Sequence, residues 1–123
     1  MSQPSANWFM DSGATHHLAL ALSNLNSTFV YPGNNKVMVG NGDLLSVHHI
    51  GSKTFKTNPK PILLNHVLHT PQIMKNLISI SKLCANNDAT VEFNSNFFIV
   101  KDRQTGRPLL QGTLDRRLYK LSS

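Results

Sequence analysis

The chain has 123 residues with 40% apolar and 15% charged side chains, and its twelve Lys and Arg against six Asp and Glu give a formal net charge of +6. This length predicts one globular domain and is too short for a two-lobed enzyme that carries its active site twice. A single Cys excludes a disulfide framework and a four-cysteine zinc site, and no apolar run approaches the roughly 18 residues of a membrane span. We therefore expect an intracellular domain without membrane contact.

The N-terminal segment is polar and then becomes strongly apolar. Residues 1–7 predict a flexible tail, and residues 8–121 predict a single domain. Trp8, Phe9 and Met10 form an apolar run that ends directly at Asp11, which indicates a buried strand followed by a carboxylate.

The rest of the chain alternates short apolar runs with turn residues. Asn41-Gly42 between two alternating runs is the strongest hairpin signal, and Asn94, Ser95 and Asn96 indicate a second hairpin. In chain order, the predicted strands after the first cover residues 18–22, 29–31, 36–39, 44–47, 62–68, 91–93, 97–101, 109–110 and 118–121.

One segment has a helical pattern. Leu77, Ile80 and Cys84 follow the spacing i, i+3, i+7, and Asn76 can cap the start, so we predict a short helix over residues 76–85 with Cys84 as a small core residue. Many short strands with one helix favour an all-β fold, specifically a small closed β-barrel.

The most informative segment for function is Asp11-Ser12-Gly13-Ala14. The preceding strand would hold the carboxylate in place, Ser12 can hydrogen-bond to a neighbouring copy of the loop, and Gly13 allows a sharp turn and a close approach. Two such carboxylates at hydrogen-bond distance share one proton, which is the chemistry of aspartic proteases. Because the chain has only one such loop, the second carboxylate would come from a second copy. The alternative interpretation is a structural turn with Asp11 as an Asx-turn former.

Longer blocks of the sequence resemble the protease domain of copia-type retrotransposon polyproteins. The resemblance begins at the segment from Trp8 to His17 and recurs in the same order further along the chain. The later blocks are residues 37–42, 65–71, 75–80, 105–112 and 118–121.

The resemblance implies a retropepsin-like barrel that acts as a homodimeric aspartic endopeptidase on the element's own Gag-Pol polyprotein. It implies Asp11 as the catalytic residue, no cofactor, and a cytoplasmic location in a virus-like particle. The active-site loop would be Ser12, Gly13, Ala14 and Thr15, and the flap over the substrate would be Gly40, Asn41, Gly42 and Asp43. The C-terminal hairpins are longer than a minimal retropepsin needs, which leaves open whether they replace its terminal-strand dimer sheet.

A non-catalytic barrel that binds RNA or polyprotein remains the alternative. The basic residues are spread along the chain with few aromatic residues between them, so we expect only a weak RNA contact. The adjacent pairs His16-His17 and His48-His49 would point to opposite faces of a strand, and we therefore predict no metal site.

Overall fold

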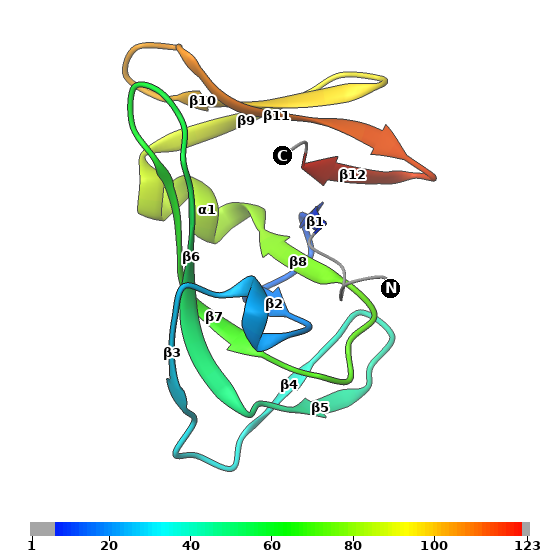
Figure 1. The fold of residues 1–123 in the computed structure, drawn as a ribbon. Helices are drawn as coiled ribbons and strands as arrows, with labels where there is room; N and C mark the ends of the chain where they lie inside the picture. The colour runs from blue at the N-terminus through cyan, green and yellow to red at the C-terminus, as the bar shows by residue number, and fades with distance from the viewer. Residues whose placement is uncertain (1–6, 122–123) are drawn as a thin grey trace, which may run out of the picture.

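The computed structural model describes residues 7–121, so most of the predicted flexible tail (residues 1–7) lies outside the described residues (Figure 1). The described chain is almost entirely β-strand, with one α-helix, α1 (Ile80–Asn87), and a short 3-10 helix (Leu22–Asn24). The strands are β1 (Trp8–Asp11), β2 (Leu18–Ala19), β3 (Ser27–Val30), β4 (Lys36–Met38), β5 (Leu44–Ser46), β6 (His49–Phe55), β7 (Ile62–His69), β8 (Asn76–Ser79), β9 (Ala89–Phe93), β10 (Phe97–Asp102), β11 (Pro108–Asp115) and β12 (Leu118–Leu121).

Ten of these strands form one sheet, in the order β3-β6-β7-β2-β8-β1-β12-β11-β10-β9, and β4 and β5 pair separately. The first strand, β1, lies inside this sheet, parallel to β8 and antiparallel to β12. A strand with neighbours on both sides has its backbone hydrogen bonds satisfied, so the end of β1 is a firmly held position for a side chain.

The all-β prediction is confirmed, but the described residues do not form the expected closed barrel. The edge strands β3 and β9 lie at opposite ends of the sheet order and do not pair with each other. The helix α1 contacts both β7 and β9 and lies between these two parts of the sheet (Figure 1). The sheet is therefore open, with α1 packed against β7 and the edge strand β9.

The helix begins later than the sequence pattern predicts. Residues 76–79 form β8, and Ser79 caps the helix by accepting a hydrogen bond from the N–H of Lys82. Strand β8 lies between β1 and β2 and forms backbone hydrogen bonds with both. This position buries Ile78 completely, beside Met10 of β1. Tertiary pairing thus overrides the helical spacing of this segment.

Asn76 does not cap the helix as predicted. Its side-chain oxygen accepts from the N–H of Leu20 at 2.8 Å, and its side-chain amide donates to the carbonyl of Asn7 at 3.0 Å. A completely buried amide is tolerated only when it is hydrogen-bonded in this way. Asn76 therefore ties together the segments on either side of β8.

The two predicted hairpins and the predicted C-terminal strand pair are confirmed, whereas β6 was not predicted at all. The pairs β4–β5 and β9–β10 are antiparallel, as expected from their turn residues, and β11 and β12 are antiparallel as well. The sequence predicted no strand for β6, which contains Gly51 and Lys53 and lacks a continuous apolar run. Its place between β3 and β7 makes it a strand.

The interior consists of two apolar clusters. The larger lies beneath β1, β7, α1 and the C-terminal hairpins and includes Trp8, Leu64 and Phe98. The smaller, built on Leu18, Val37 and Ile73, anchors the β4–β5 hairpin to the rest of the domain. No helix in the described residues is long and apolar enough to cross a membrane.

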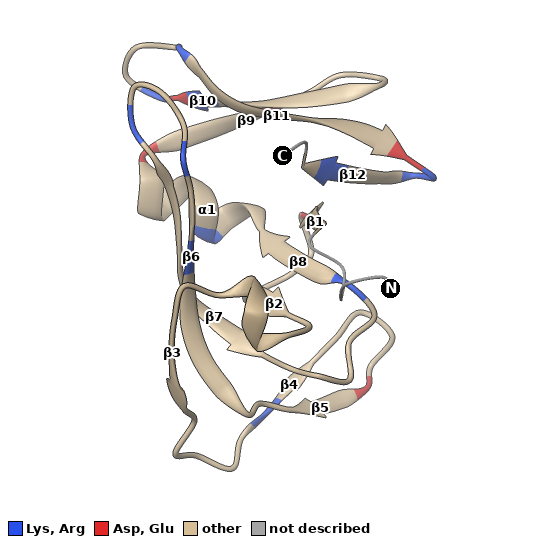
Figure 2. Cartoon of the chain, viewed as in Figure 1, with Lys and Arg blue, Asp and Glu red and all other residues tan. Residues whose placement is uncertain are grey.

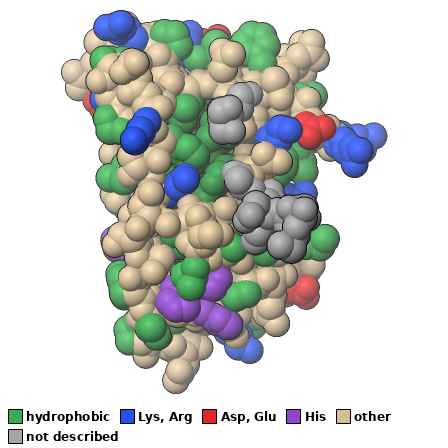
Figure 3. All heavy atoms as spheres, viewed as in Figure 1, with side chains coloured by type: hydrophobic (Ala, Val, Ile, Leu, Met, Phe, Trp, Pro, Cys, Tyr) green, Lys and Arg blue, Asp and Glu red, His purple; other side chains and the backbone are tan. Residues whose placement is uncertain are grey.

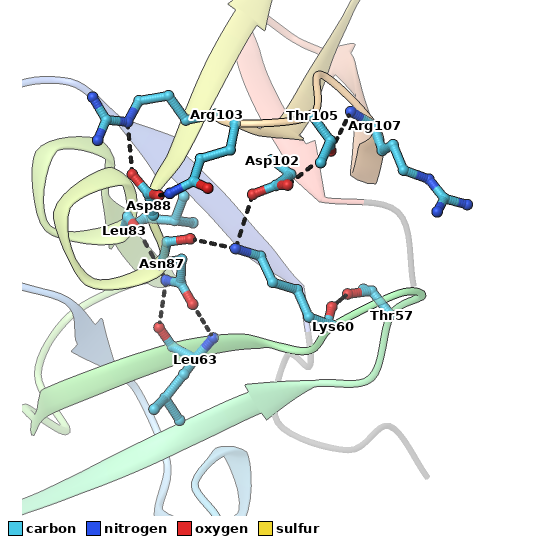
Figure 4. Close-up of polar contacts among 11 residues, drawn as sticks. Thr57, Lys60, Leu63, Leu83, Asn87, Asp88, Asp102, Arg103, Thr105 and Arg107 are labelled. Carbon is cyan, nitrogen blue, oxygen red and sulfur yellow. Dashed lines mark hydrogen bonds and ion pairs between the residues drawn. The ribbon is translucent and has the colours of Figure 1, made fainter.

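A polar network joins the C-terminal end of α1 to the β-hairpins around it (Figure 4). Lys60 Nζ donates to the carbonyl of Asn87 at 3.0 Å and lies 3.0 Å from Asp102 Oδ1. Asp88 ends the helix in the left-handed conformation and forms an ion pair with Arg103 at 2.6 Å. These contacts fix β9 and β10 against the helix, and with them the C-terminal strands that flank β1.

Candidate active site

Asp11 lies at the end of β1, where the chain leaves the sheet. It is in register with Ser79 of the parallel strand β8. The N–H of Gly13 donates to Asp11 Oδ1 at 2.9 Å, and the N–H of Ala14 approaches the Asp11 carbonyl at 3.4 Å. No Lys or Arg of the described chain forms an ion pair with this carboxylate, so its charge is oriented but not neutralised.

A cleft opens at this carboxylate. It consists of two adjoining hollows of about 370 and 420 Å³, which share Asp11, Val39 and Leu77 in their walls. Val39 follows β4 and Leu77 lies on β8, so the cleft runs between the β4–β5 hairpin and the central strands. The first hollow is lined in addition by Ala14, His16, Leu18 and Met38, and the second by Asn41, Leu45, Ile73, Lys75 and Leu118.

The predicted flap residues form the exposed turn of the β4–β5 hairpin. Gly42 has a φ of +91°, a conformation that glycine adopts without strain, and its N–H donates to the carbonyl of Val39 at 2.8 Å. The side chain of Asn41 hydrogen-bonds to both the N–H and the carboxylate of Asp43. Gly40, Asn41 and Asp43 each line one of the two hollows, so the structure places the hairpin turn beside Asp11, 29 positions away in sequence.

The loop residues divide between two sides of β1. Gly13, Ala14 and Thr15 line the cleft with Asp11, whereas Ser12 is exposed and lines a separate hollow on the other side. Gly13 does not have a positive φ, and a Cβ there would lie 3.5 Å from Asp11 Oδ1, an ordinary contact. The turn after Asp11 therefore does not depend on a left-handed backbone at Gly13, and the expected close approach of a second chain to this glycine stays a prediction.

His17, which the sequence indicated only as half of the pair His16-His17, is a further residue next to the site. It is completely buried, and its Nδ1 accepts from the N–H of Ser79 at 3.0 Å, the residue opposite Asp11. This acceptor role places the ring proton on Nε2, which has no hydrogen-bond partner among the described residues. Burial, with the nearby charge of Lys82, lowers the pKa of His17 to about 4. The buried ring therefore stays neutral and connects the active-site loop to β8.

We expect His17 to make the protein less stable in acid. Between pH 6.5 and about 4 the unfolded chain binds a proton that the folded ring rejects, so the free energy of unfolding should fall with decreasing pH. Over this window the loss should reach about 3 kcal/mol. Urea denaturation across the pH range measures it.

The control is His17→Asn, whose side-chain oxygen can accept from Ser79 but does not titrate. This variant should be less stable at neutral pH and should show a smaller loss of stability on acidification than the unmodified protein. Equal pH dependence in both proteins would contradict the role assigned to His17. His69 titrates in both, so it does not affect the difference.

Among the other histidines, His48 and His49 contact His69, which is distant from them in sequence. His49 Nδ1 and His69 Nδ1 lie 3.0 Å apart as cross-strand partners on β6 and β7, and the His48 ring packs edge-on against His69. Figure 3 shows histidine side chains gathered on one face of the molecule. No group of three or more His, Cys, Asp or Glu in residues 7–121 is arranged to hold a metal ion. Cys84 is half-buried against the larger apolar cluster, and burial raises its pKa.

The chain is similar to known proteins over nearly all of its length. The family described as "Pol polyprotein, beta-barrel domain" matches residues 8–88. Two proteins of Arabidopsis thaliana, the retrovirus-related Pol polyproteins from transposons RE1 and RE2, are each 44% identical to it, over 94% and 93% of this chain. The chain spans only 8% of the length of each of these relatives. No solved structure matches it.

Proposed function

Because the chain belongs to the family of Pol polyprotein beta-barrel domains from retrotransposons, we propose that it is an aspartic endopeptidase that processes a Gag-Pol polyprotein as a homodimer. Each chain supplies one catalytic carboxylate, that of Asp11. Copia-type elements are the class whose protease domain its sequence blocks resemble. The natural location of such an activity is a cytoplasmic virus-like particle, and its chemistry requires no cofactor.

The observation that carries the proposal is the position of Asp11 in the cleft beneath the β4–β5 hairpin. A polypeptide in extended conformation fits a groove that has a carboxylate on one side and an exposed hairpin on the other. Val39 and Leu77 flank Asp11 with apolar surface suited to substrate side chains. The turn residues Gly40 and Gly42 carry no side chain that would obstruct a substrate backbone.

In the proposed reaction the two Asp11 carboxyl groups of the dimer share one proton. The ionised group removes a proton from a water molecule, whose oxygen attacks the carbonyl carbon of the scissile peptide bond. The protonated group gives its proton to the carbonyl oxygen. Collapse of the resulting diol breaks the C–N bond, and the proton taken from water goes to the leaving amine. One diol hydroxyl returns its proton to the carboxylate that had protonated the carbonyl oxygen, which leaves a carboxylic acid product and restores the shared proton of the pair. Because one proton must be retained, activity should be highest at mildly acidic pH.

A peptidase assay with class-specific inhibitors tests the proposal. The substrate is a segment of the parent polyprotein that spans the borders of this domain. We expect cleavage that a transition-state analogue of aspartic peptidases abolishes, whereas metal chelators and serine-directed reagents leave the rate unchanged. Cleavage that resists the aspartic inhibitor and stops with a chelator or a serine reagent would contradict the assignment.

No particular observation favours RNA binding as the main activity. The Lys and Arg residues are dispersed over β4, β6, α1, β10, β12 and several loops rather than gathered on one element (Figure 2). Several are already engaged: Lys60, Lys101, Arg103 and Lys120 form ion pairs with carboxylates. Such a distribution supports at most the weak, salt-sensitive contact that any basic protein makes with RNA.

A further inference from the structure

Two histidines from neighbouring strands bring the same ring nitrogen to one point. Nδ1 of His49 and Nδ1 of His69 lie 3.0 Å apart, although the residues are 20 positions apart in sequence. They are opposite each other in the antiparallel pair β6–β7, and we call them the cross-strand pair. Neither residue lines the two hollows at Asp11, so the pair lies outside the candidate active site. The prediction of no metal site rested on histidines adjacent in sequence, which point to opposite faces of a strand.

The sheet holds the backbone of both histidines in place. On the strand at its other side, His49 is opposite Val30 of β3, and His69 is opposite Ala19 of β2. Each histidine therefore lies on a strand that is paired on both sides. The His69 residue is buried, and its ring is also hydrogen-bonded to the backbone of Leu20. A histidine that binds a metal ion usually has such a second partner, which fixes the orientation of the ring.

The separation of the two nitrogens suits two ligands of one metal ion. Without an ion, two neutral imidazoles at this distance share one proton, which one ring donates to the other. A metal ion can take the place of that proton. With metal–nitrogen bonds of about 2.05 Å, two nitrogens 3.0 Å apart enclose an angle of roughly 95° at the metal, close to that of neighbouring ligands in square-planar or octahedral coordination. His49 is half-buried, so its ring can tilt to direct its lone pair at the ion.

The surroundings of the pair suit a cation. His49 is half-buried and its neighbour His48 is exposed, so solvent reaches the pair, and Figure 3 shows histidine side chains together at the surface. Burial and the charges of His49 and His48 lower the pKa of His69, and no Lys or Arg of the described chain is among the causes. An ion at this place therefore meets no fixed positive charge beside it, although the chain has a net charge of +6.

We propose that His49 and His69 bind one divalent transition-metal ion of the kind that prefers imidazole, such as Zn²⁺ or Cu²⁺, through their Nδ1 atoms. Water occupies the remaining positions, because no third His, Cys, Asp or Glu of the described residues is arranged to join the pair. The ion joins β6 to the end of β7, from which the chain continues into residues 72–75 of the second hollow. It stabilises the fold and takes no part in cleavage.

The first test is isothermal titration of the whole chain with Zn²⁺. We expect one ion per chain, and His49→Gln should weaken its binding about tenfold or more, because the loss of a ligand costs at least as much as the loss of a partner that orients one. The matched control is His66→Asn, which removes an exposed histidine of β7 at a φ of +53°, a conformation that asparagine tolerates. Its affinity should stay within about threefold of the original.

The choice of ion tests the ligand chemistry. Cu²⁺ should bind more tightly than Zn²⁺, because sites with nitrogen ligands follow that order. Mg²⁺ should not bind, since it prefers oxygen ligands. Binding of Mg²⁺ as tight as that of Zn²⁺ would indicate carboxylates instead of histidines and would overturn the proposal.

NMR of the imidazole groups gives a second test that needs no substitution at the site. Addition of Zn²⁺ should shift the ring resonances of His49 and His69 and leave those of His16 and His66 in place. This measurement decides the matter if His49→Gln fails to fold. Shifts at His16 or His66 without shifts at the cross-strand pair would contradict the proposed ligands.

Thermal unfolding separates this site from the peptidase. Zn²⁺ should raise the midpoint of the unmodified chain and of Asp11→Asn, but not that of His49→Gln, because only a folded state that binds the ion is stabilised by it. Loss of the effect in Asp11→Asn would place the ion in the cleft and overturn the proposal. No binding at millimolar Zn²⁺, or equal weakening by His49→Gln and His66→Asn, would overturn it as well. A chain that binds Zn²⁺ as expected but cleaves nothing would refute the proposed function and support the metal site.

Discussion

Replacement of Asp11 by Asn should abolish peptidase activity, with a loss of about a thousandfold or more in kcat. The amide oxygen of Asn can still accept the hydrogen bond from the N–H of Gly13, so the loop should keep its shape. The amide can neither share the proton of the pair nor activate water. Thermal unfolding of the variant should match that of the unmodified chain, which separates lost chemistry from lost structure.

The control for this change is Glu92→Gln, which removes the same charge from an exposed carboxylate of β9. Its activity should change by less than about twofold, because Glu92 lies outside the cleft. If Asp11→Asn cleaves as fast as Glu92→Gln, Asp11 is not the catalytic residue.

A mixing experiment tests whether two chains share one site. When equal amounts of the unmodified chain and Asp11→Asn exchange subunits freely, about one quarter of the dimers contain two Asp11 residues. Activity should therefore fall to about one quarter of that of the unmodified chain at the same total concentration. A value of one half would mean that each chain works alone.

Gly112→Ala should be the most destabilising small substitution in the C-terminal hairpins. A Cβ at this position would overlap the carbonyl oxygen of Lys120 and the ring of Phe98. The carbonyl belongs to the paired strand β12 and the ring is completely buried, so neither can move without separating strands. We expect a loss of about 3 kcal/mol or more in the free energy of unfolding, measured by urea denaturation.

Gly40→Ala is the matched control for stability. A Cβ at Gly40 meets no atom within 4 Å, and the residue does not have a positive φ. The free energy of unfolding should therefore change by less than about 0.5 kcal/mol. If Gly112→Ala is as stable as Gly40→Ala, then Gly112 does not pack as closely against β12 and Phe98 as described here.

Local patterns predicted those elements whose cause is local. Asn41-Gly42 indicated the β4–β5 hairpin, because a tight turn that connects two antiparallel strands depends on a few neighbouring residues. The same kind of pattern failed at residues 76–79. The spacing of Leu77 and Ile80 suits a helix, but residues 76–79 form strand β8 because they pair with β1. Strand β6 was missed for a related reason, since Gly51 and Lys53 become strand residues through β3 and β7.

The candidate site also combines features that local sequence predicts with features that depend on tertiary contacts. By itself the sequence determined that an apolar strand ends at a carboxylate followed by Ser12 and Gly13, because the strand pattern and the motif are contiguous in the chain. It also determined that the chain has one such loop, so a two-carboxylate mechanism needs two copies. The residue blocks of the family located the flap by resemblance rather than by any contact.

Only the tertiary structure decided what surrounds Asp11. It placed the hairpin turn beside the carboxylate, directed Ser12 to the opposite side of β1, and buried His17 as a neutral link to Ser79. It also left the sheet open, with α1 packed against β7 and β9, where the pattern of many short strands had suggested a closed barrel. These features arise from strand order and from packing between residues far apart in the chain, and such contacts leave no periodic trace in the sequence.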